Sequence, residues 1–272
     1  MKKMVSMIVI GVLALSCLFA GGERDSSARE AYTIEVGGST SVTPLMEMFA
    51  AEYERTRPHI KVNINGTGSG DGIRNAGALY QIGMSSRDLT PTEQGQGLNE
   101  TVVAIDGIAV IVNTANPVSN LTVAQIRDIY TGAITDWSQV SGGAKSGRIA
   151  VISREPGSGT RGAFEELVDF QGRLLAGANE STSTGAIRAG IVSNPDAIGY
   201  ISLGSVDNTV KAVAVGGVAS TSANVLNGSY RIARPFIVIT GSNLHPESKS
   251  FVDWMLSREA QAIVRRSWIP VR

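Results

Sequence analysis

The chain has 272 residues, of which 43% are hydrophobic and 18% charged, and its 24 Lys and Arg residues balance 24 Asp and Glu residues. This composition excludes a disordered chain, and a net charge of zero leaves no basic footprint for DNA or RNA. The length suits one large domain or two smaller ones with their own cores. One cysteine, Cys17, and two histidines, His59 and His245, exclude a disulfide framework and argue against a metal site. We therefore expect no resident metal and no cofactor.

The amino terminus has the pattern of an export signal. Lys2 and Lys3 precede an uncharged apolar stretch from Met4 to Leu18, which is too short to span a membrane. This pattern predicts a protein that is exported to the periplasm or the cell surface.

The position of Cys17 predicts a lipid anchor. Cys17 ends the apolar stretch and is followed by the polar run from Gly21 to Ser27, as in a bacterial lipoprotein signal. We predict a signal peptide over residues 1–16, acylation of Cys17 and a tether over residues 17–31. The alternative is cleavage near Ala20 without acylation.

Beyond the tether, strand and helix patterns alternate. Runs of apolar or alternating residues predict strands over residues 32–36, 60–64, 102–113, 149–153, 197–201, 210–215 and 235–240. Helical spacing predicts helices over residues 41–55, 73–80, 123–130, 162–170, 184–193 and 248–265. This alternation predicts an α/β fold with mostly parallel sheets, whose ligands bind beyond the carboxyl ends of the strands.

Four polar turns rich in glycine and hydroxyl residues lie between these elements. They occupy residues 37–41, 66–72, 84–88 and 153–161. Hydroxyl groups, exposed backbone N–H groups and helix amino ends together bind oxyanions. One such turn is an ordinary helix cap, but four in one chain, the last with two arginines, indicate an anion site.

The residues in these turns form a specific combination. It comprises Gly-Gly-Ser-Thr-Ser at 37–41, Gly-Ser-Gly at 68–70, Ser-Ser-Arg-Asp-Leu at 85–89, Ser-Arg-Glu-Pro-Gly-Ser-Gly-Thr-Arg at 153–161 and Ala-Ile-Gly-Tyr at 197–200. With the stretch 121–137, it resembles the phosphate-binding proteins of bacterial ABC phosphate importers over residues 32–272. The resemblance implies a two-lobed periplasmic binding protein (type II), two sheets joined by a hinge with two crossovers, and no enzymatic activity. It also implies a monomer that passes inorganic phosphate to the membrane subunits of an ABC permease.

The resemblance also implies which residues bind phosphate. Thr40, Ser41 and Ser69 would bind from the first lobe, and Arg154, Ser158, Gly159 and Thr160 from the second. Short donors around one guanidinium suit a dehydrated dianion. Arg161 is left open, because it is either a further ligand or a structural partner of Glu165 at i+4.

One position departs from the family pattern. Longer members place a carboxylate, which accepts the proton of hydrogen phosphate, where this sequence has Ser86. Ser86 and its neighbour Arg87 are therefore candidate site residues. Asp106 is the first choice for a substitute carboxylate, and Asp71 is the second.

The long apolar run at residues 102–113 predicts the outward crossover between lobes, and residues 234–239 the return. Lobe 1 would then comprise residues 32–106 and 235–272, and lobe 2 residues 107–234. Alternative functions are a receptor for sulfate or molybdate, a receptor that signals or adheres, and a phosphate-ester hydrolase. The sequence contains neither a Gly-x-Ser-x-Gly elbow nor a Walker motif, which argues against the hydrolase.

Overall fold

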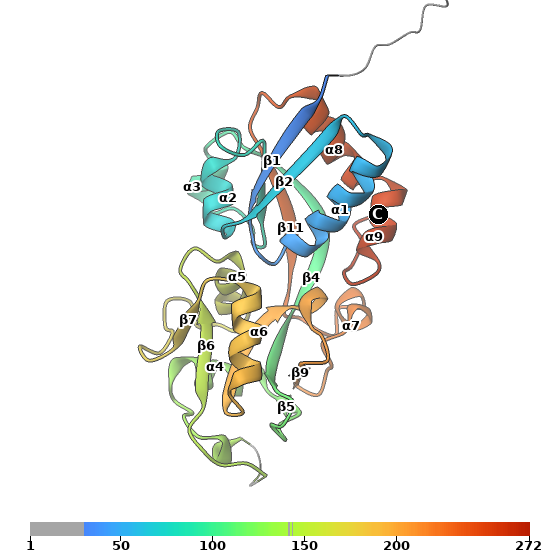
Figure 1. Ribbon diagram of the computed structural model, residues 1–272. Coiled ribbons are helices and arrows are strands. Elements are labelled where there is room, and N and C mark those ends of the chain that lie inside the picture. Colours follow the sequence, from blue (N-terminus) through green and yellow to red (C-terminus); the bar gives the residue numbers. More distant parts are fainter. Residues whose placement is uncertain (1–29, 141, 143) are drawn as a thin grey trace, which may run out of the picture. The chain divides into compact units, whose positions relative to one another are not determined.

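The computed structural model describes residues 30–140, 142 and 144–272 (Figure 1). The predicted signal peptide, Cys17 and the predicted tether up to residue 29 lie outside the described residues. Residues 31–272 form one compact unit. None of the described helices is both long and apolar enough to cross a membrane.

Strands and helices alternate along the described chain, as the sequence predicts. The first part contains β1 (Tyr32–Gly38), α1 (Thr43–Thr56), β2 (Ile60–Gly66), α2 (Ser69–Asn75), β3 (Ile82–Ser85), α3 (Pro91–Gln94) and β4 (Asn99–Asn113). The middle part contains β5 (Asn120–Leu121), α4 (Val123–Thr131), β6 (Ala150–Arg154), α5 (Gly159–Leu167), β7 (Asn179–Ser181), α6 (Thr184–Ser193) and β8 (Ala197–Ser202). The last part contains β9 (Val210–Ala212), β10 (Ala214–Val215), α7 (Ser222–Leu226), β11 (Ala233–Thr240), α8 (Pro246–Met255) and α9 (Arg258–Val264). Two short 3-10 helices, η1 (Trp137–Gln139) and η2 (Leu203–Ser205), complete the set.

The strands form two half-sheets that share β4. Their hydrogen-bonded order is β2-β1-β3-β11-β4-β8-β6-β7, with β9 also on β4 and a separate β5-β10 pair. Pairing is parallel within β2-β1-β3 and within β8-β6-β7, whereas every pair made by β4 or β11 is antiparallel. The fold is therefore α/β, and its parallel strands are those outside the two crossovers.

The predicted strand at 102–113 is a single long strand in the structure. β4 pairs with β11 up to Gly107 and with β8 from Ile108 onward. Figure 1 shows β4 and β11 passing together from the half that holds β1 to the half that holds β6. A strand of this length passes through both halves because each half gives it a different hydrogen-bonding partner.

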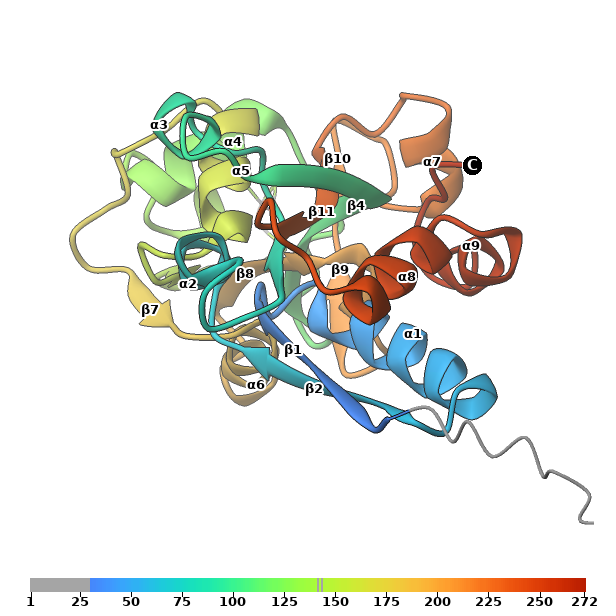
Figure 2. The same cartoon turned by 90° about the horizontal axis from the view of Figure 1, so that it is seen from above.

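Each half has its own large hydrophobic cluster. The first gathers apolar residues of β1, α1, α8 and α9, including Phe49 and Trp254. The second gathers residues of α4, α5 and β8, including Tyr130, Phe164 and Tyr200. The rings of Phe164 and Tyr200 stack with centroids 4.0 Å apart. Figure 2 shows α8 and α9 beside α1, across β1 from α2.

The predicted helix at 73–80 is wrong in its boundaries. The helix α2 spans Ser69–Asn75 and therefore includes the glycines that the sequence assigned to a turn. A Cβ on Gly72 would lie 2.7 Å from the carbonyl oxygen of Gly37 and 2.8 Å from that of Met84. The glycine is needed because α2 packs directly on the backbone of β1 and β3, a contact that is not visible in the sequence.

Three other predicted elements differ from the structure. The predicted helix at 162–170 begins three residues earlier, because Ser158 caps α5 by accepting a hydrogen bond from the Arg161 N–H at 3.3 Å. The predicted strand at 210–215 is two strands, β9 on β4 and β10 on β5. The predicted helix at 248–265 is also two, since Ser257 caps a new helix after α8.

Candidate functional site

Three of the predicted polar turns, at 37–41, 66–72 and 153–161, lie at helix amino ends, and a further polar run at 181–183 leads into α6. Helices α1, α2, α5 and α6 follow strands β1, β2, β6 and β7 respectively. The first two belong to one half of the structure and the last two to the other. Because parallel strands end at the same edge of a sheet, each pair of helix amino ends points to one place.

Six buried hydroxyl groups meet where these helices begin, and we call them the hydroxyl cluster. They belong to Ser39, Ser41, Ser69, Ser86, Thr160 and Thr184. The Ser41 oxygen lies 2.8 Å from that of Thr160 and 3.0 Å from that of Thr184. The Ser86 oxygen accepts from Ser39 at 2.9 Å and lies 3.3 Å from Ser69 and 3.4 Å from Thr160. The cluster therefore joins side chains from both halves.

Backbone groups of the two halves also meet at the cluster. The Gly70 N–H donates to the Gly157 carbonyl at 3.0 Å. A Cβ on Gly159 would lie only 2.3 Å from the Ser69 oxygen, so glycine is required for this approach. The N–H groups of Gly159 and Thr160, in the first turn of α5, have no hydrogen-bond partner among the described residues. These N–H groups carry partial positive charge and are available to an anion.

A buried guanidinium group enters the same loop. Arg154 ends β6, and its side chain is only 2% exposed. Its Nε and Nη2 each donate to a carboxylate oxygen of Glu155 at 2.8 Å, and the Nη1 has no partner among the described residues. The backbone N–H of Arg154 donates to the Tyr200 hydroxyl at 3.3 Å, which fixes the end of the strand. The site thus offers hydroxyl groups, free N–H groups and one oriented positive charge.

Comparison with known proteins identifies the family. The model of the PBP superfamily domain matches residues 24–259. The chain belongs to the PBP superfamily.

Its relatives include PstS-type phosphate-binding proteins. A solved putative phosphate ABC transporter substrate-binding protein with bound phosphate, from Clostridium perfringens, is 45% identical, with a TM-score of 0.86 and coverage of 89% of this chain and 100% of that one. An ABC-type phosphate transport receptor from Vibrio cholerae is 36% identical, with a TM-score of 0.71 and coverage of 87% and 99%. The phosphate-binding protein PstS of Borreliella burgdorferi is 29% identical, with coverage of 97% and 96%.

Several residues that the sequence selected for this PBP-superfamily site lie in or beside the hydroxyl cluster. Ser41, Ser69, Ser86 and Thr160 are members of it. Thr40 lies next to it, where its hydroxyl oxygen accepts from the Thr184 N–H at 3.3 Å. Ser158 caps α5, the helix that supplies Gly159 and Thr160.

Arg87 and Arg161 are also paired with carboxylates, as Arg154 is with Glu155. Arg87 donates through both terminal nitrogens to the Glu93 carboxylate, at 2.7 and 2.8 Å, and holds the pKa of Glu93 down at about 2. Arg161 donates to Glu165 at 2.7 Å, to Glu180 at 2.8 Å and to the Arg154 carbonyl at 2.8 Å. The predicted pairing of Arg161 with Glu165 is therefore confirmed, whereas the predicted contact of Arg87 with phosphate remains a prediction.

Among the described residues, neither substitute carboxylate is hydrogen-bonded to the hydroxyl cluster, and the predicted role of each as proton acceptor remains a prediction. Asp106 is fully buried, accepts from Ser202 at 2.8 Å and pairs with Arg234 at 3.0 Å. Burial raises the pKa of Asp106 to about 6 in spite of Arg234. Asp71 accepts from Asn75 at 2.9 Å and from Tyr80 at 3.0 Å within its own half, and a hydrogen bond from the Thr67 side chain is the main cause that lowers its pKa.

Sequence reasoning missed Ser39 and Thr184. Ser39 lies in the polar turn at 37–41, but the predicted phosphate ligands in that turn are only Thr40 and Ser41. Thr184 begins α6 after the polar run Ser181-Thr182-Ser183, which has the same hydroxyl-before-helix signal as the other turns. A search for every such turn finds both residues.

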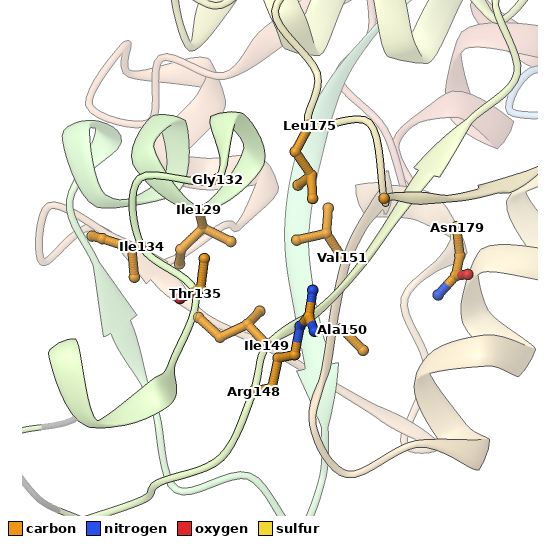
Figure 3. A pocket seen from close by; sticks show the side chains of 11 residues that line it. Ile129, Gly132, Ile134, Thr135, Arg148, Ile149, Ala150, Val151, Leu175 and Asn179 are labelled. Atoms are coloured by element: carbon orange, nitrogen blue, oxygen red, sulfur yellow. The ribbon is translucent and has the colours of Figure 1, made fainter.

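Two further observations delimit the site. Among the described residues, no group of three or more His, Cys, Asp or Glu side chains is placed to hold a metal ion. A separate pocket of about 260 Å³ lies at the amino end of β6, between Ile129, Arg148, Val151 and Leu175 (Figure 3). Its lining shares no residue with the hydroxyl cluster, which lies beyond the carboxyl end of the same strand.

Proposed function

We propose that this protein binds inorganic phosphate between its two halves and delivers it to an ABC import permease. The hydroxyl cluster carries this proposal, because it gathers hydroxyl groups from both halves beside free N–H groups and Arg154. The phosphate-bound relative from Clostridium perfringens supports the choice of anion. We also propose that the protein is a binding protein and not an enzyme, since its relatives are transport receptors.

The proposed phosphate ligands come from both halves. They are Thr40, Ser41, Ser69 and Ser86 from the first half, and Arg154, Ser158, Gly159, Thr160 and Thr184 from the second. Each charge-assisted hydrogen bond of this kind contributes about 1.5 to 3 kcal/mol. Several together offset the cost of removing a dianion from water.

Binding proceeds by closure at the crossover strands. We propose a first lobe of residues 32–106 and 235–272 and a second of residues 107–234, with the hinge in β4 and β11. Phosphate first meets the amino ends of α1 and α2. Rotation of the second lobe then brings up the Gly159 and Thr160 N–H groups and the Arg154 guanidinium. In the closed form, the hydrogen bond from the Gly70 N–H to the Gly157 carbonyl joins the two lobes on that side.

By the sequence resemblance, Ser86 stands where longer family members have a carboxylate. A serine oxygen accepts the proton of hydrogen phosphate and also donates to a fully ionised oxyanion. We therefore expect weaker discrimination against sulfate than a carboxylate provides.

Titration of the purified mature protein tests this function. Isothermal calorimetry with phosphate, arsenate, sulfate and molybdate should give the tightest binding for phosphate. Tighter binding of sulfate or molybdate would identify another oxyanion receptor, and release of phosphate from a monoester would identify a hydrolase.

We further propose that Cys17 anchors the exported protein to a membrane. The position of Cys17 after the apolar signal stretch supports this proposal. The variant Cys17→Ser should move the protein from the membrane fraction to the soluble fraction. A wild-type protein that carries no acyl group by mass spectrometry would refute the anchor without affecting the phosphate proposal.

A further inference from the structure

A buried ion pair links the two crossover strands beside the anion site. Asp106 on β4 and Arg234 on β11 are direct partners in the strand register. Their side chains are 0% and 2% exposed, and the Arg234 Nη2 donates to Asp106 Oδ2 at 3.0 Å. The pair therefore lies in the two strands on which closure depends.

The same guanidinium reaches the loop that carries Ser86. Strand β3 ends at Ser85 and pairs with β11, so Ser86 follows β3 on the side from which Arg234 approaches. The Arg234 Nη1 donates to the Ser86 carbonyl at 3.2 Å. The hydroxyl group of that same residue contacts Ser39, Ser69 and Thr160 in the cluster. One side chain thus joins the crossover to the ligand-binding loop.

One nitrogen of the Arg234 guanidinium, the Nε, is unusual for a buried donor. This Nε is buried and has no hydrogen-bond partner among the described residues, which is rare for a buried donor and calls for an explanation. The pKa of Arg234 is lowered first by burial and also by the nearby positive charge of Arg154, while Asp106 raises it. Two buried guanidinium groups that repel each other fit a site that is completed by an anion.

We infer that Arg234 is a positioning residue of the anion site, held at the crossover by Asp106 so that it fixes the Ser86 loop and adds positive charge behind it. This inference rests on the proposed binding of phosphate. It gives the Asp106–Arg234 pair a role in phosphate affinity that does not depend on direct contact with the anion. Lysine cannot replace Arg234, because only the planar fork reaches Asp106 and the Ser86 carbonyl together.

The pair has a defined set of neighbours. Asp106 faces Arg234 on β11, the hydroxyl of Ser202 and the N–H of Gly204 beside β8, and Tyr230, whose pKa is raised by burial and by the Asp106 charge. Arg154 is the other charged group near Arg234. Asp106 is therefore the one acid among these neighbours that pairs with Arg234. Protonation of its carboxylate near pH 6 would break this ion pair.

Phosphate affinities of matched variants test the inference. At pH 8, Asp106→Asn and Arg234→Lys should each weaken phosphate binding at least tenfold. Ser202→Ala is the matched control, because it removes a donor to the other oxygen of Asp106 and leaves the Arg234 contacts in place. It should change the affinity less than twofold. Circular dichroism and thermal melting establish that each variant is folded.

A pH profile separates positioning from a merely structural role. The ratio of wild-type to Asp106→Asn affinity should fall between pH 8 and pH 5.5, because the wild-type carboxyl becomes neutral like the amide. Comparison at each pH cancels the ionisation of phosphate itself. A ratio that stays constant, or tighter binding by Asp106→Asn, would overturn the inference.

A variant that fails to fold, and a wild-type protein that fails to bind phosphate, can each be distinguished from failure of the positioning role. If the single variants do not fold, the neutral pair Asp106→Asn with Arg234→Gln keeps the shape and should still bind at least tenfold more weakly. Wild-type affinity in any folded Asp106 or Arg234 variant would refute the positioning role alone. A wild-type protein that does not bind phosphate would instead refute the proposed function.

Discussion

Ser41 and Thr160 are 119 residues apart in the chain, yet their hydroxyl oxygens lie 2.8 Å apart. Ser41 precedes α1 in the first half, and Thr160 begins α5 in the second. This contact means that the described conformation is closed at the hydroxyl cluster. In the binding that we propose, the anion replaces these hydroxyl contacts between the halves with contacts to itself.

Removing these hydroxyl groups should weaken phosphate binding. Ser41→Ala and Thr160→Val each lose one donor to a charged ligand, which corresponds to about 1.5 to 3 kcal/mol. Calorimetry should therefore show a loss of roughly tenfold to a hundredfold for each. Ser183→Ala, which removes the α6 cap just outside the cluster, is the control and should bind phosphate almost normally. Equal losses in all three variants would contradict a specific role for the cluster.

Gly159→Ala should prevent closure. A Cβ at this position would lie 2.3 Å from the Ser69 oxygen and 3.0 Å from the Ser86 oxygen, so the halves cannot approach. The variant should still fold, because each half has its own hydrophobic cluster. Phosphate affinity should fall by at least a hundredfold. Gly162→Ala on the same helix is the control, because its Cβ would meet only the Arg87 side chain at an ordinary 3.4 Å.

Removing the guanidinium of Arg154 should cost more than removing any one hydroxyl. Arg154→Ala deletes the buried positive charge beside the cluster, and loss of one partner of a buried charge pair costs about 2 to 5 kcal/mol. Arg154→Lys should recover part of this loss through charge alone. The exposed Arg173→Ala serves as the control for net charge. Phosphate affinity unchanged in a folded Arg154→Ala protein would exclude Arg154 from the site.

The elements of the fold were largely predictable from local patterns. The helix at Thr184–Ser193 has the predicted bounds, and most strands differ from prediction by a few residues. The helix α2 was misplaced because its glycines have the local signature of a turn. Their real function is to let α2 lie against the backbone of β1 and β3, which depends on tertiary packing.

The pairing of side chains across the chain was not predictable in the same way. Nothing near Asp106 in the sequence indicates that Arg234, 128 residues later, is its partner. Their contact follows from the register of β4 with β11, which a single sequence does not reveal. The pairing of Arg161 with Glu165 could be predicted from the sequence, because the two residues lie one helical turn apart.

Glu93 should make stability depend on pH in a narrow acidic window. The hydrogen bond from Arg87 is the main cause that lowers the pKa of Glu93 to about 2 in the folded protein, from an ordinary value of 4.5. A depressed carboxyl pKa stabilises the fold above pH 4.5, and this contribution is lost as the pH falls toward 2. Glu93→Gln should lower the melting temperature at pH 7 and flatten its change between pH 4.5 and 2. The exposed Glu47→Gln on α1 should leave the profile unchanged, and an identical effect of both would contradict the assignment.

Ser86→Asp should sharpen the choice of phosphate over sulfate. The new carboxylate would lie among Ser39, Ser69 and Thr160, where it accepts the proton of hydrogen phosphate and repels fully ionised sulfate. The dissociation constant for sulfate divided by that for phosphate should rise at least tenfold, which is about 1.4 kcal/mol. Competition titration measures this ratio. Asp106→Asn is the counterpart: because both oxygens of Asp106 already have protein partners, it should weaken both anions and leave their ratio unchanged. A ratio that responds to Asp106→Asn and not to Ser86→Asp would place the proton acceptor at Asp106 instead.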